Sequence, residues 1–218
     1  MPAKNSIKQY VENGYYHIYN RGVEKREIFM DQQDQVVFLR YLQEYLLPKN
    51  EQELSDQLSA PDITPAEKKR ILKLLALNNF HDEITLLAYC LMPNHFHFFV
   101  HQRKPNSIDK FMNSLATRYS MYFNKKYDRV GSLYQDVYKA VRVETESHFL
   151  HLTRYIHQQA LPYHPSSYKV YITQEQSSWV HPEEVLSYFS KHHSYLTYES
   201  FMKEDGNFLP DDIILEKD

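Results

Sequence analysis

The residues best suited to chemistry are two histidines, His95 and His97, which lie two positions apart within the apolar and aromatic run 91–100. In a β-strand, side chains at i and i+2 point to the same face, so both imidazoles would project side by side. Imidazole nitrogen is a good ligand for divalent metal ions. The pair therefore predicts a site for one metal ion that leaves coordination positions for a third ligand and a substrate oxygen.

The histidine pair does not establish a metal site by itself. The chain has 12 histidines among 218 residues, so a His-x-His sequence arises by chance about as often as not. Two half-buried histidines that form only hydrogen bonds within a sheet are the simpler alternative. The surrounding sequence has to decide between these interpretations.

A second candidate group lies on the predicted helix 147–159. Tyr155 and Gln159 are one turn apart and share a face with His148 and His151, because residues three, four or seven apart are neighbours on a helix. Tyr155 offers a hydroxyl nucleophile, and Gln159 offers a carboxamide oxygen. An ordinary interfacial helix with a polar stripe is the alternative interpretation.

The elements that position these residues follow from hydrophobic periodicity and helix-capping signals. Segments 84–90 and 95–100, joined by Met92-Pro93-Asn94, predict a β-hairpin. The other expected elements are strands over 15–20 and 133–143 and helices over 33–47, 64–77, 107–126 and 147–159, with a further helix from residue 182. Antiparallel strands and helices in this order predict an α+β fold, with helices packed on the sheet.

The domain organisation is expected to be simple. A chain of 218 residues can bury one full core with additions. We predict one domain over residues 1–165 with a helical insertion at 49–82, followed by a C-terminal extension over 166–218 that wraps on the core. Within the insertion, Thr64-Pro65-Ala66-Glu67 has the sequence of a capping box with proline at the first helical position.

Composition excludes several classes of function. Cys90 is the only cysteine, which excludes a disulfide framework and a cysteine-based zinc site. The four glycines are too widely spaced for a P-loop or a dinucleotide-binding fingerprint. Residues 1–9 lack an apolar signal segment, and the longest apolar run, 86–92, is far shorter than the roughly 18 residues of a membrane span. We therefore expect a cytoplasmic protein without a membrane partner.

Charge is unevenly distributed along the chain, although the net charge is only −3. Residues 103–142 carry a net charge of +6, whereas residues 199–218 carry −5. A solvated surface is one explanation, but basic residues interleaved with tyrosines are also typical of surfaces that bind phosphates and stack unpaired bases. An acidic terminus that lies across this surface is a further hypothesis. The predicted DNA contacts are Arg118, Lys125, Lys126, Arg129, Tyr134, Tyr138, Lys139 and Arg142.

Six blocks of sequence occur in a fixed order over about residues 14–160. They are Tyr-His-Ile-Tyr-Asn-Arg-Gly-Val (16–23), Met-Pro-Asn-His-Phe-His (92–97), Arg118-Tyr119-x-x-Tyr122-Phe123-Asn124, Gly131-Ser132-Leu133-Tyr134-Gln135, Tyr138-Lys139-Ala140 and Arg154-Tyr155-Ile156-His157. Together these blocks resemble the REP-associated tyrosine transposases of the HUH single-tyrosine transposase superfamily. The resemblance implies a ferredoxin-like antiparallel sheet with helices on one side, Mg²⁺ or Mn²⁺ as cofactor, and single-stranded or hairpin DNA as substrate.

The resemblance also assigns roles by position. His95 and His97 match the metal-binding histidines, Tyr155 matches the nucleophile, and Gln159 matches a third metal-binding side chain. Members of this branch more often have an Asn-Pro pair where this chain has Gln159-Ala160, and both retain a carboxamide oxygen. The implied activity is metal-dependent cleavage and transfer of single-stranded DNA at hairpin-forming repeats, through a covalent 5′-phosphotyrosine. A monomer with Tyr155 acting in cis is implied, with a dimer as the alternative.

Other assignments stay open at the level of sequence. Tyr119 and Tyr122 are rival nucleophiles, although their apolar stripe favours core packing or base stacking. A phenol with a pKa near 10 needs activation at neutral pH, and the metal, Lys139, His151 or His157 could supply it. Two other functions are a metal-dependent phosphohydrolase without a covalent intermediate and a DNA-hairpin-binding protein that lacks cleavage.

Overall fold

The computed structural model describes residues 10–173, 177–189 and 197–204, so most of the acidic terminus lies outside the described residues. The strands are β1 (Gly14–Arg21), β2 (Ile84–Met92), β3 (His95–Gln102) and β4 (Lys139–Val143). The helices are the 3₁₀ turn η1 (Val23–Lys25), α1 (Gln32–Leu46), α2 (Glu51–Leu58), α3 (Pro65–Leu75), α4 (Ser107–Lys126), α5 (Glu146–Ala160), α6 (Tyr168–Ile172), α7 (Glu183–Leu186) and α8 (Tyr198–Lys203).

The four strands form one antiparallel sheet in the order β2-β3-β1-β4. Along the chain, the central elements follow the sequence β1-α1-β2-β3-α4-β4. This combination of element order and strand order is the ferredoxin-like topology. The predicted fold class, an α+β protein with a ferredoxin-like antiparallel sheet, is confirmed.

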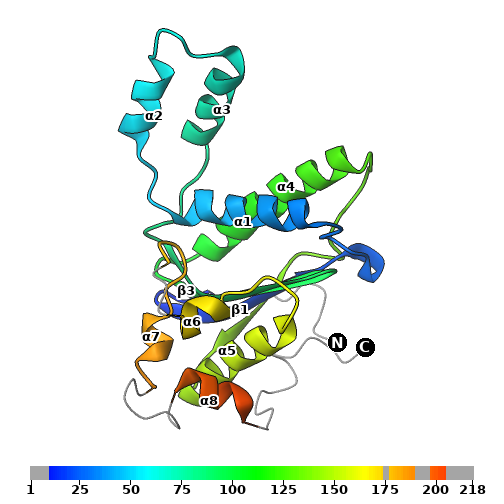
Figure 1. Cartoon of the computed structure of the whole chain (residues 1–218), viewed down its shortest axis with the longest axis vertical. Coiled ribbons are helices and arrows are strands. Elements are labelled where there is room, and N and C mark those ends of the chain that lie inside the picture. The colour runs from blue at the N-terminus through cyan, green and yellow to red at the C-terminus, as the bar shows by residue number, and fades with distance from the viewer. Residues whose placement is uncertain (1–9, 174–176, 190–196, 205–218) are drawn as a thin grey trace.

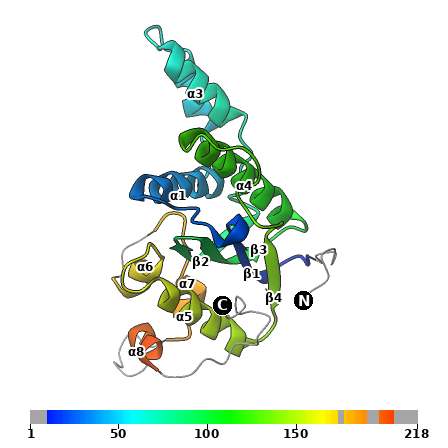
Figure 2. The same ribbon diagram turned by 90° about the vertical axis from the view of Figure 1, so that its right-hand side faces the viewer.

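Helices cover both faces of this sheet. Figures 1 and 2 show α1 and α4 over one face and α5 to α8 over the other. The expectation of helices on one side is therefore wrong. The reason lies in β3, which has buried apolar residues on both faces: Phe96 and Phe98 belong to the core under α1 and α4, whereas Phe99, on the face of the histidines, belongs to the core under α5. A sheet of this kind needs a second covering layer to remove its other face from water.

Capping residues fix the ends of three predicted helices. The Asp31 carboxylate accepts a hydrogen bond from the Asp34 N–H at 2.9 Å and starts α1. Thr64 forms the predicted capping box at the start of α3, and Thr145 caps α5 by accepting from the N–H of His148 at 3.2 Å. Each cap satisfies a backbone donor that the helix itself leaves unpaired.

Helices α2 and α3, which follow α1 and precede β2 in the chain, form a helical arm that projects from the molecule (Figures 1 and 2). The prediction missed α2, whose start is capped by the Asn50 carboxamide. The arm is closed at its base, where Lys49 Nζ donates to the carbonyl oxygens of Leu75 and Leu77 at 2.9 and 3.1 Å.

The predicted strand over 133–143 is wrong in its first half, because only Lys139–Val143 is a strand. Tyr134 and Tyr138 are buried, whereas Val137 between them is 63% exposed. The segment before β4 instead attaches to the end of β1, where the N–H of Gln135 donates to the Arg21 carbonyl at 2.9 Å. Alternating sequence alone did not distinguish this irregular segment from a strand.

The described part of the C-terminal extension packs against β2 and α5. Ser167 N–H donates to the Tyr89 carbonyl at 3.0 Å, and the Tyr171 hydroxyl donates to the Leu87 carbonyl at 2.9 Å. The carboxamide of Gln158 in α5 donates to the Met202 carbonyl of α8 at 3.1 Å. None of the helices in the described part of the chain is long and apolar enough to cross a membrane.

Candidate active site

His95 and His97 lie side by side on β3, and their ring centroids are 5.1 Å apart. Strand pairing places them opposite Arg21 and Tyr19 of β1. His97 is fully buried and His95 is half-buried. The expectation that both imidazoles share one face is therefore confirmed.

Tyr155 reaches the same face from α5. Its ring centroid is 5.4 Å from that of His97, and the side chain is only 6% exposed. The orientation of α5 is fixed by Phe149, Leu152 and Ile156, which are buried in the core between this helix and the sheet. The apolar face predicted for the helix thus sets the direction of Tyr155. The tyrosine and the histidines that it contacts belong to the same chain.

The third predicted metal ligand, Gln159, follows Tyr155 by one turn of α5 and is half-buried. His151, from the same predicted stripe, lies within hydrogen-bonding distance of Arg154, at 2.8 Å from its guanidinium nitrogen. Within the described residues, no group of three or more His, Cys, Asp or Glu side chains is arranged to hold a metal ion. Among the described residues, the candidate for a third ligand is therefore a side chain of another type, the carboxamide of Gln159.

The electrostatics of His97 suit a metal ligand. Burial, together with the neighbouring His17 and His95, holds the pKa of His97 well below its usual value, so this imidazole is neutral at physiological pH. Its Nε2 atom is buried and has no hydrogen-bond partner among the described residues. Since an unsatisfied buried nitrogen is costly, a bound divalent cation would stabilise it. His95 and His97 therefore fit a divalent metal ion.

Two residues around the histidines were given no role by the sequence analysis. His17 Nε2 lies 2.8 Å from His97 Nδ1, and Asn94 Oδ1 lies 2.6 Å from His95 Nδ1. Both residues stand inside blocks that carry the family resemblance. Their place inside these blocks was the only feature of the sequence that pointed to them, because the contact between His17 and His97 depends on β1 pairing with β3.

The loop after β1 supports the turn that carries Asn94. Gly22 N–H donates to the Asn94 carbonyl at 2.8 Å, and Ile28 N–H donates to the Pro93 carbonyl at 2.8 Å. A Cβ atom at Gly22 would lie 2.2 Å from the carbonyl oxygen of Arg26, so only glycine fits this position. Two of the family-like sequence blocks therefore meet directly beside the histidines.

The three candidate bases differ in their access to Tyr155. His157 is fully buried, its two ring nitrogens lie 2.6 Å from the Tyr198 hydroxyl and 2.7 Å from the Ser167 hydroxyl, and burial lowers its pKa to about 3. These contacts assign it a structural role. His151 contacts Arg154, as described above. Lys139 on β4 is exposed and pairs with Tyr19 on β1, which pairs with His97 on β3. Of the three candidate bases, Lys139 is therefore the one that lies in the same row of the sheet as His97.

Two of the predicted DNA contacts are enclosed in the core. Tyr134 and Tyr138 are 7% and 3% exposed and belong to the core between the sheet and the pair α1 and α4. The Tyr138 hydroxyl donates to the Asp109 carboxylate. Base stacking needs an open ring face, so this burial contradicts the predicted DNA-contact role of both tyrosines.

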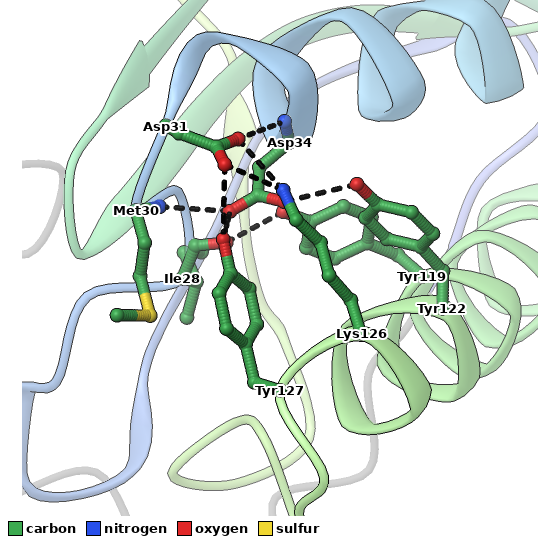
Figure 3. A network of polar contacts seen from close by, with 8 residues as sticks. All are labelled: Ile28, Met30, Asp31, Asp34, Tyr119, Tyr122, Lys126 and Tyr127. Atoms are coloured by element: carbon green, nitrogen blue, oxygen red, sulfur yellow. Dashed lines mark hydrogen bonds and ion pairs between the residues drawn. The ribbon is translucent and has the colours of Figure 1, made fainter.

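Lys126 is part of a polar network that joins α4 to the start of α1 (Figure 3). Its Nζ lies 2.7 Å from an Asp31 carboxylate oxygen and 2.8 Å from one of Asp34. Tyr122 and Tyr127 donate to Asp34 from the same helix and the residue after it, at 3.0 and 2.7 Å. Lys126, which was predicted to contact DNA, therefore forms structural ion pairs instead.

The other predicted basic contacts divide between the two faces of the molecule. Arg118 of α4 pairs with Glu44, and Arg129 donates to the Asn124 carboxamide at 2.9 Å. Lys125 at the end of α4 is exposed. Figures 1 and 2 show α4 across the sheet from α5. On the edge strand β4, Lys139 and Arg142 are exposed, and Arg142 lies 3.3 Å from Glu144.

Comparison with known proteins tests the resemblance that the sequence blocks indicated. The family described as "Transposase IS200 like" matches residues 59–159, a range that includes the histidine pair and Tyr155. The resemblance to the tyrosine transposases is confirmed. It favours a transposase-type role in DNA processing. No curated protein matches the chain.

Two solved structures share a weaker likeness. The structure of a REP-associated tyrosine transposase bound to a REP hairpin aligns with 81% of this chain and 90% of its own, at 10% identity and a TM-score of 0.44. A protein of Deinococcus radiodurans R1 described as a transposase aligns with 71% of this chain and 97% of its own, at 17% identity and a TM-score of 0.29.

Proposed function

We propose that this protein cleaves and rejoins single-stranded DNA at hairpin-forming repeats, with Tyr155 as the nucleophile and a divalent metal ion, Mg²⁺ or Mn²⁺, held by His95, His97 and Gln159. The observation that carries the proposal is the contact between the Tyr155 and His97 rings, 5.4 Å apart within one chain. A phenol next to a pair of metal-binding histidines is the arrangement that a metal-assisted tyrosine nuclease requires.

The proposed reaction exchanges one phosphodiester for another. The phenolic oxygen of Tyr155 bonds to phosphorus, the bond from phosphorus to the 3′ oxygen breaks, and the proton lost by the phenol is balanced by the proton gained at the 3′ oxygen. The products are a 5′-phosphotyrosine and a free 3′-hydroxyl. Attack by another 3′-hydroxyl reverses the step and joins strands. This exchange needs no nucleotide, which agrees with the absence of a P-loop in the sequence.

The side chains around Tyr155 have separate tasks. His95, His97 and the Gln159 carboxamide would hold the metal ion. The ion, when bound, withdraws charge from the scissile phosphate and favours the phenolate. The apolar residues Phe149 and Leu152 hold α5 on the sheet and so keep the phenol at the histidines. Because both parts of the site come from one chain, we propose that the monomer acts in cis.

The first test is the substitution Tyr155→Phe, examined with single-stranded hairpin oligonucleotides. The change removes one oxygen and little packing area, so we expect loss of the covalent protein–DNA adduct and an affinity within a few-fold of the unsubstituted protein. Tyr163→Phe is a matched control, because Tyr163 is 88% exposed and lies outside α5. An adduct of full yield with Tyr155→Phe would disprove the assignment.

The second test concerns the metal ion. We expect His95→Ala and His97→Ala to reduce cleavage by orders of magnitude and to weaken its dependence on Mg²⁺ or Mn²⁺. We expect Gln159→Ala to have a smaller effect, because both histidines remain to hold the ion. Cleavage at the same rate in chelator and in metal would contradict the proposed site. Cleavage that leaves no adduct would instead indicate a phosphohydrolase, and binding without cleavage would indicate a hairpin-binding protein.

A further inference from the structure

We infer that His17 is a positioning residue for this site, because its imidazole holds His97 in the tautomer and orientation that present Nε2 to a divalent metal ion. The inference rests on the proposed function, since it concerns the metal bound by His95 and His97. It assigns a task to a fully buried histidine on the neighbouring strand β1 that the proposed chemistry does not otherwise use.

The contact between the two histidines is specific in geometry. His17 Nε2 and His97 Nδ1 are 2.8 Å apart, and their rings are stacked with an interplanar angle of 16°. The strand register places His17 opposite Phe99, so the imidazole reaches along the sheet to its diagonal neighbour His97. The hydrogen bond is therefore a property of these two side chains and is not imposed by backbone pairing.

The hydrogen bond determines which nitrogen of His97 can bind metal. A metal-binding imidazole is neutral and therefore carries one N–H. When Nδ1 of His97 carries the hydrogen, it donates to Nε2 of His17, and Nε2 of His97 keeps its lone pair. That atom is buried without a hydrogen-bond partner in the described part of the chain, so its lone pair is available to bind a metal ion. Metal-binding histidines commonly donate their other N–H in this way.

The neighbouring ligand has the same arrangement. Asn94 Oδ1 lies 2.6 Å from Nδ1 of His95, and a carboxamide oxygen only accepts, so Nδ1 of His95 is the donor. Asn94 itself is held by the N–H of Gly22 on its carbonyl. Both histidines of the pair thus have Nδ1 engaged by an outer residue. The shared pattern supports a single purpose, which is to fix both rings for one metal ion.

The test is the affinity of the full chain for Mn²⁺, measured by the electron paramagnetic resonance signal of free Mn²⁺ without DNA. His17→Leu removes the acceptor, and we expect the affinity to fall about tenfold or more, the usual effect of losing an outer partner of a metal ligand. His17→Gln keeps an acceptor oxygen near the position of Nε2, and we expect an affinity within about threefold. The matched control is His101→Leu, because His101 lies on the same face of β3 but stacks on Tyr15.

The outcomes separate this inference from the proposed function. Unchanged Mn²⁺ affinity in His17→Leu, with binding by the unsubstituted protein, would overturn the positioning role and leave the metal site intact. No Mn²⁺ binding by the unsubstituted protein would overturn both. If His17→Leu does not fold, ¹⁵N NMR of the unsubstituted, metal-free protein decides: a hydrogen on Nδ1 of His97 supports the inference, and a hydrogen on Nε2 overturns it.

Discussion

At the scale of single residues, Asp34 shows how a buried charge is accommodated at the edge of the core. Its side chain is fully buried and accepts from the backbone N–H of Met30, from Tyr122 and Tyr127, and from Lys126 (Figure 3). Four donors compensate for the removal of the carboxylate from water. Burial lowers the pKa of Lys126, but its hydrogen bonds to Asp31 and Asp34 raise this pKa above its usual value, so the ammonium keeps its charge.

We predict that Asp34→Asn lowers the free energy of unfolding by about 2–4 kcal/mol, because it leaves buried donors without a charged acceptor. Equilibrium unfolding in urea measures this change. Asp31→Asn is the matched control: Asp31 is 47% exposed on its side chain and asparagine can still cap α1, so the loss should be much smaller than with Asp34→Asn. Equal effects of the two substitutions would contradict this account.

The candidate site was predictable from the sequence wherever local geometry decided it. The two-residue spacing of His95 and His97 fixed their common face, and the apolar residues of α5 fixed the direction of Tyr155. His17 was not predictable in this way. Its role depends on β1 lying next to β3, and strand neighbours are set by the whole sheet rather than by spacing along one strand.

At the scale of elements, the extension after residue 165 holds the outer side of the helix that carries Tyr155. Arg154 Nη1 donates to the Phe201 carbonyl of α8 at 3.2 Å, and its guanidinium lies over the Phe201 ring at 4.6 Å. His157, three residues on, contacts Tyr198 of α8 and Ser167 before α6. The sequence predicted that the extension wraps on the core, but which helix it holds follows only from these contacts.

The buried His157 predicts an acid dependence of stability. Burial lowers its pKa to about 3 in the folded protein, against about 6.5 in the unfolded chain. The unfolded state therefore binds more protons between these values, so stability is fully present above pH 6.5 and falls as the pH drops toward 3. The slope from this residue is at most about 1.4 kcal/mol per pH unit.

Urea unfolding between pH 7.5 and 4.5 tests this dependence. The rings of Tyr168, Tyr171 and Tyr198 surround His157, and the buried His97 changes in the same direction, so both histidines contribute. We expect His157→Gln to lower stability at pH 7.5 and to flatten its decrease in acid. His148→Gln, an exchange of the same type near the start of the same helix, is the matched control. An equal slope in His157→Gln would refute the assignment.

At the scale of the whole molecule, the sheet separates two groups of basic residues that were predicted to form one surface. The basic block after the histidine pair was expected to form a single surface near the site. In the structure, α4 lies on the face opposite α5 (Figures 1 and 2). On the edge strand β4, Lys139 pairs with Tyr19 on the active-site face, whereas Arg142 pairs with Tyr16, which belongs to the core on the α4 face. A charge count along the chain cannot detect this division, because it depends on which face each helix covers.

This division predicts unequal roles for two exposed lysines. Lys139 pairs across the sheet with Tyr19 and so lies in the same row as His97, whereas Lys125 is on α4. We expect Lys139→Ala to weaken binding of a single-stranded hairpin oligonucleotide several-fold. The slope of log affinity against log salt concentration should fall in magnitude by about one, which corresponds to one lost phosphate contact. Lys125→Ala is the matched control and should change affinity by less than about twofold. Fluorescence anisotropy at two salt concentrations measures both, and a larger loss with Lys125→Ala would place the DNA on the opposite face of the sheet.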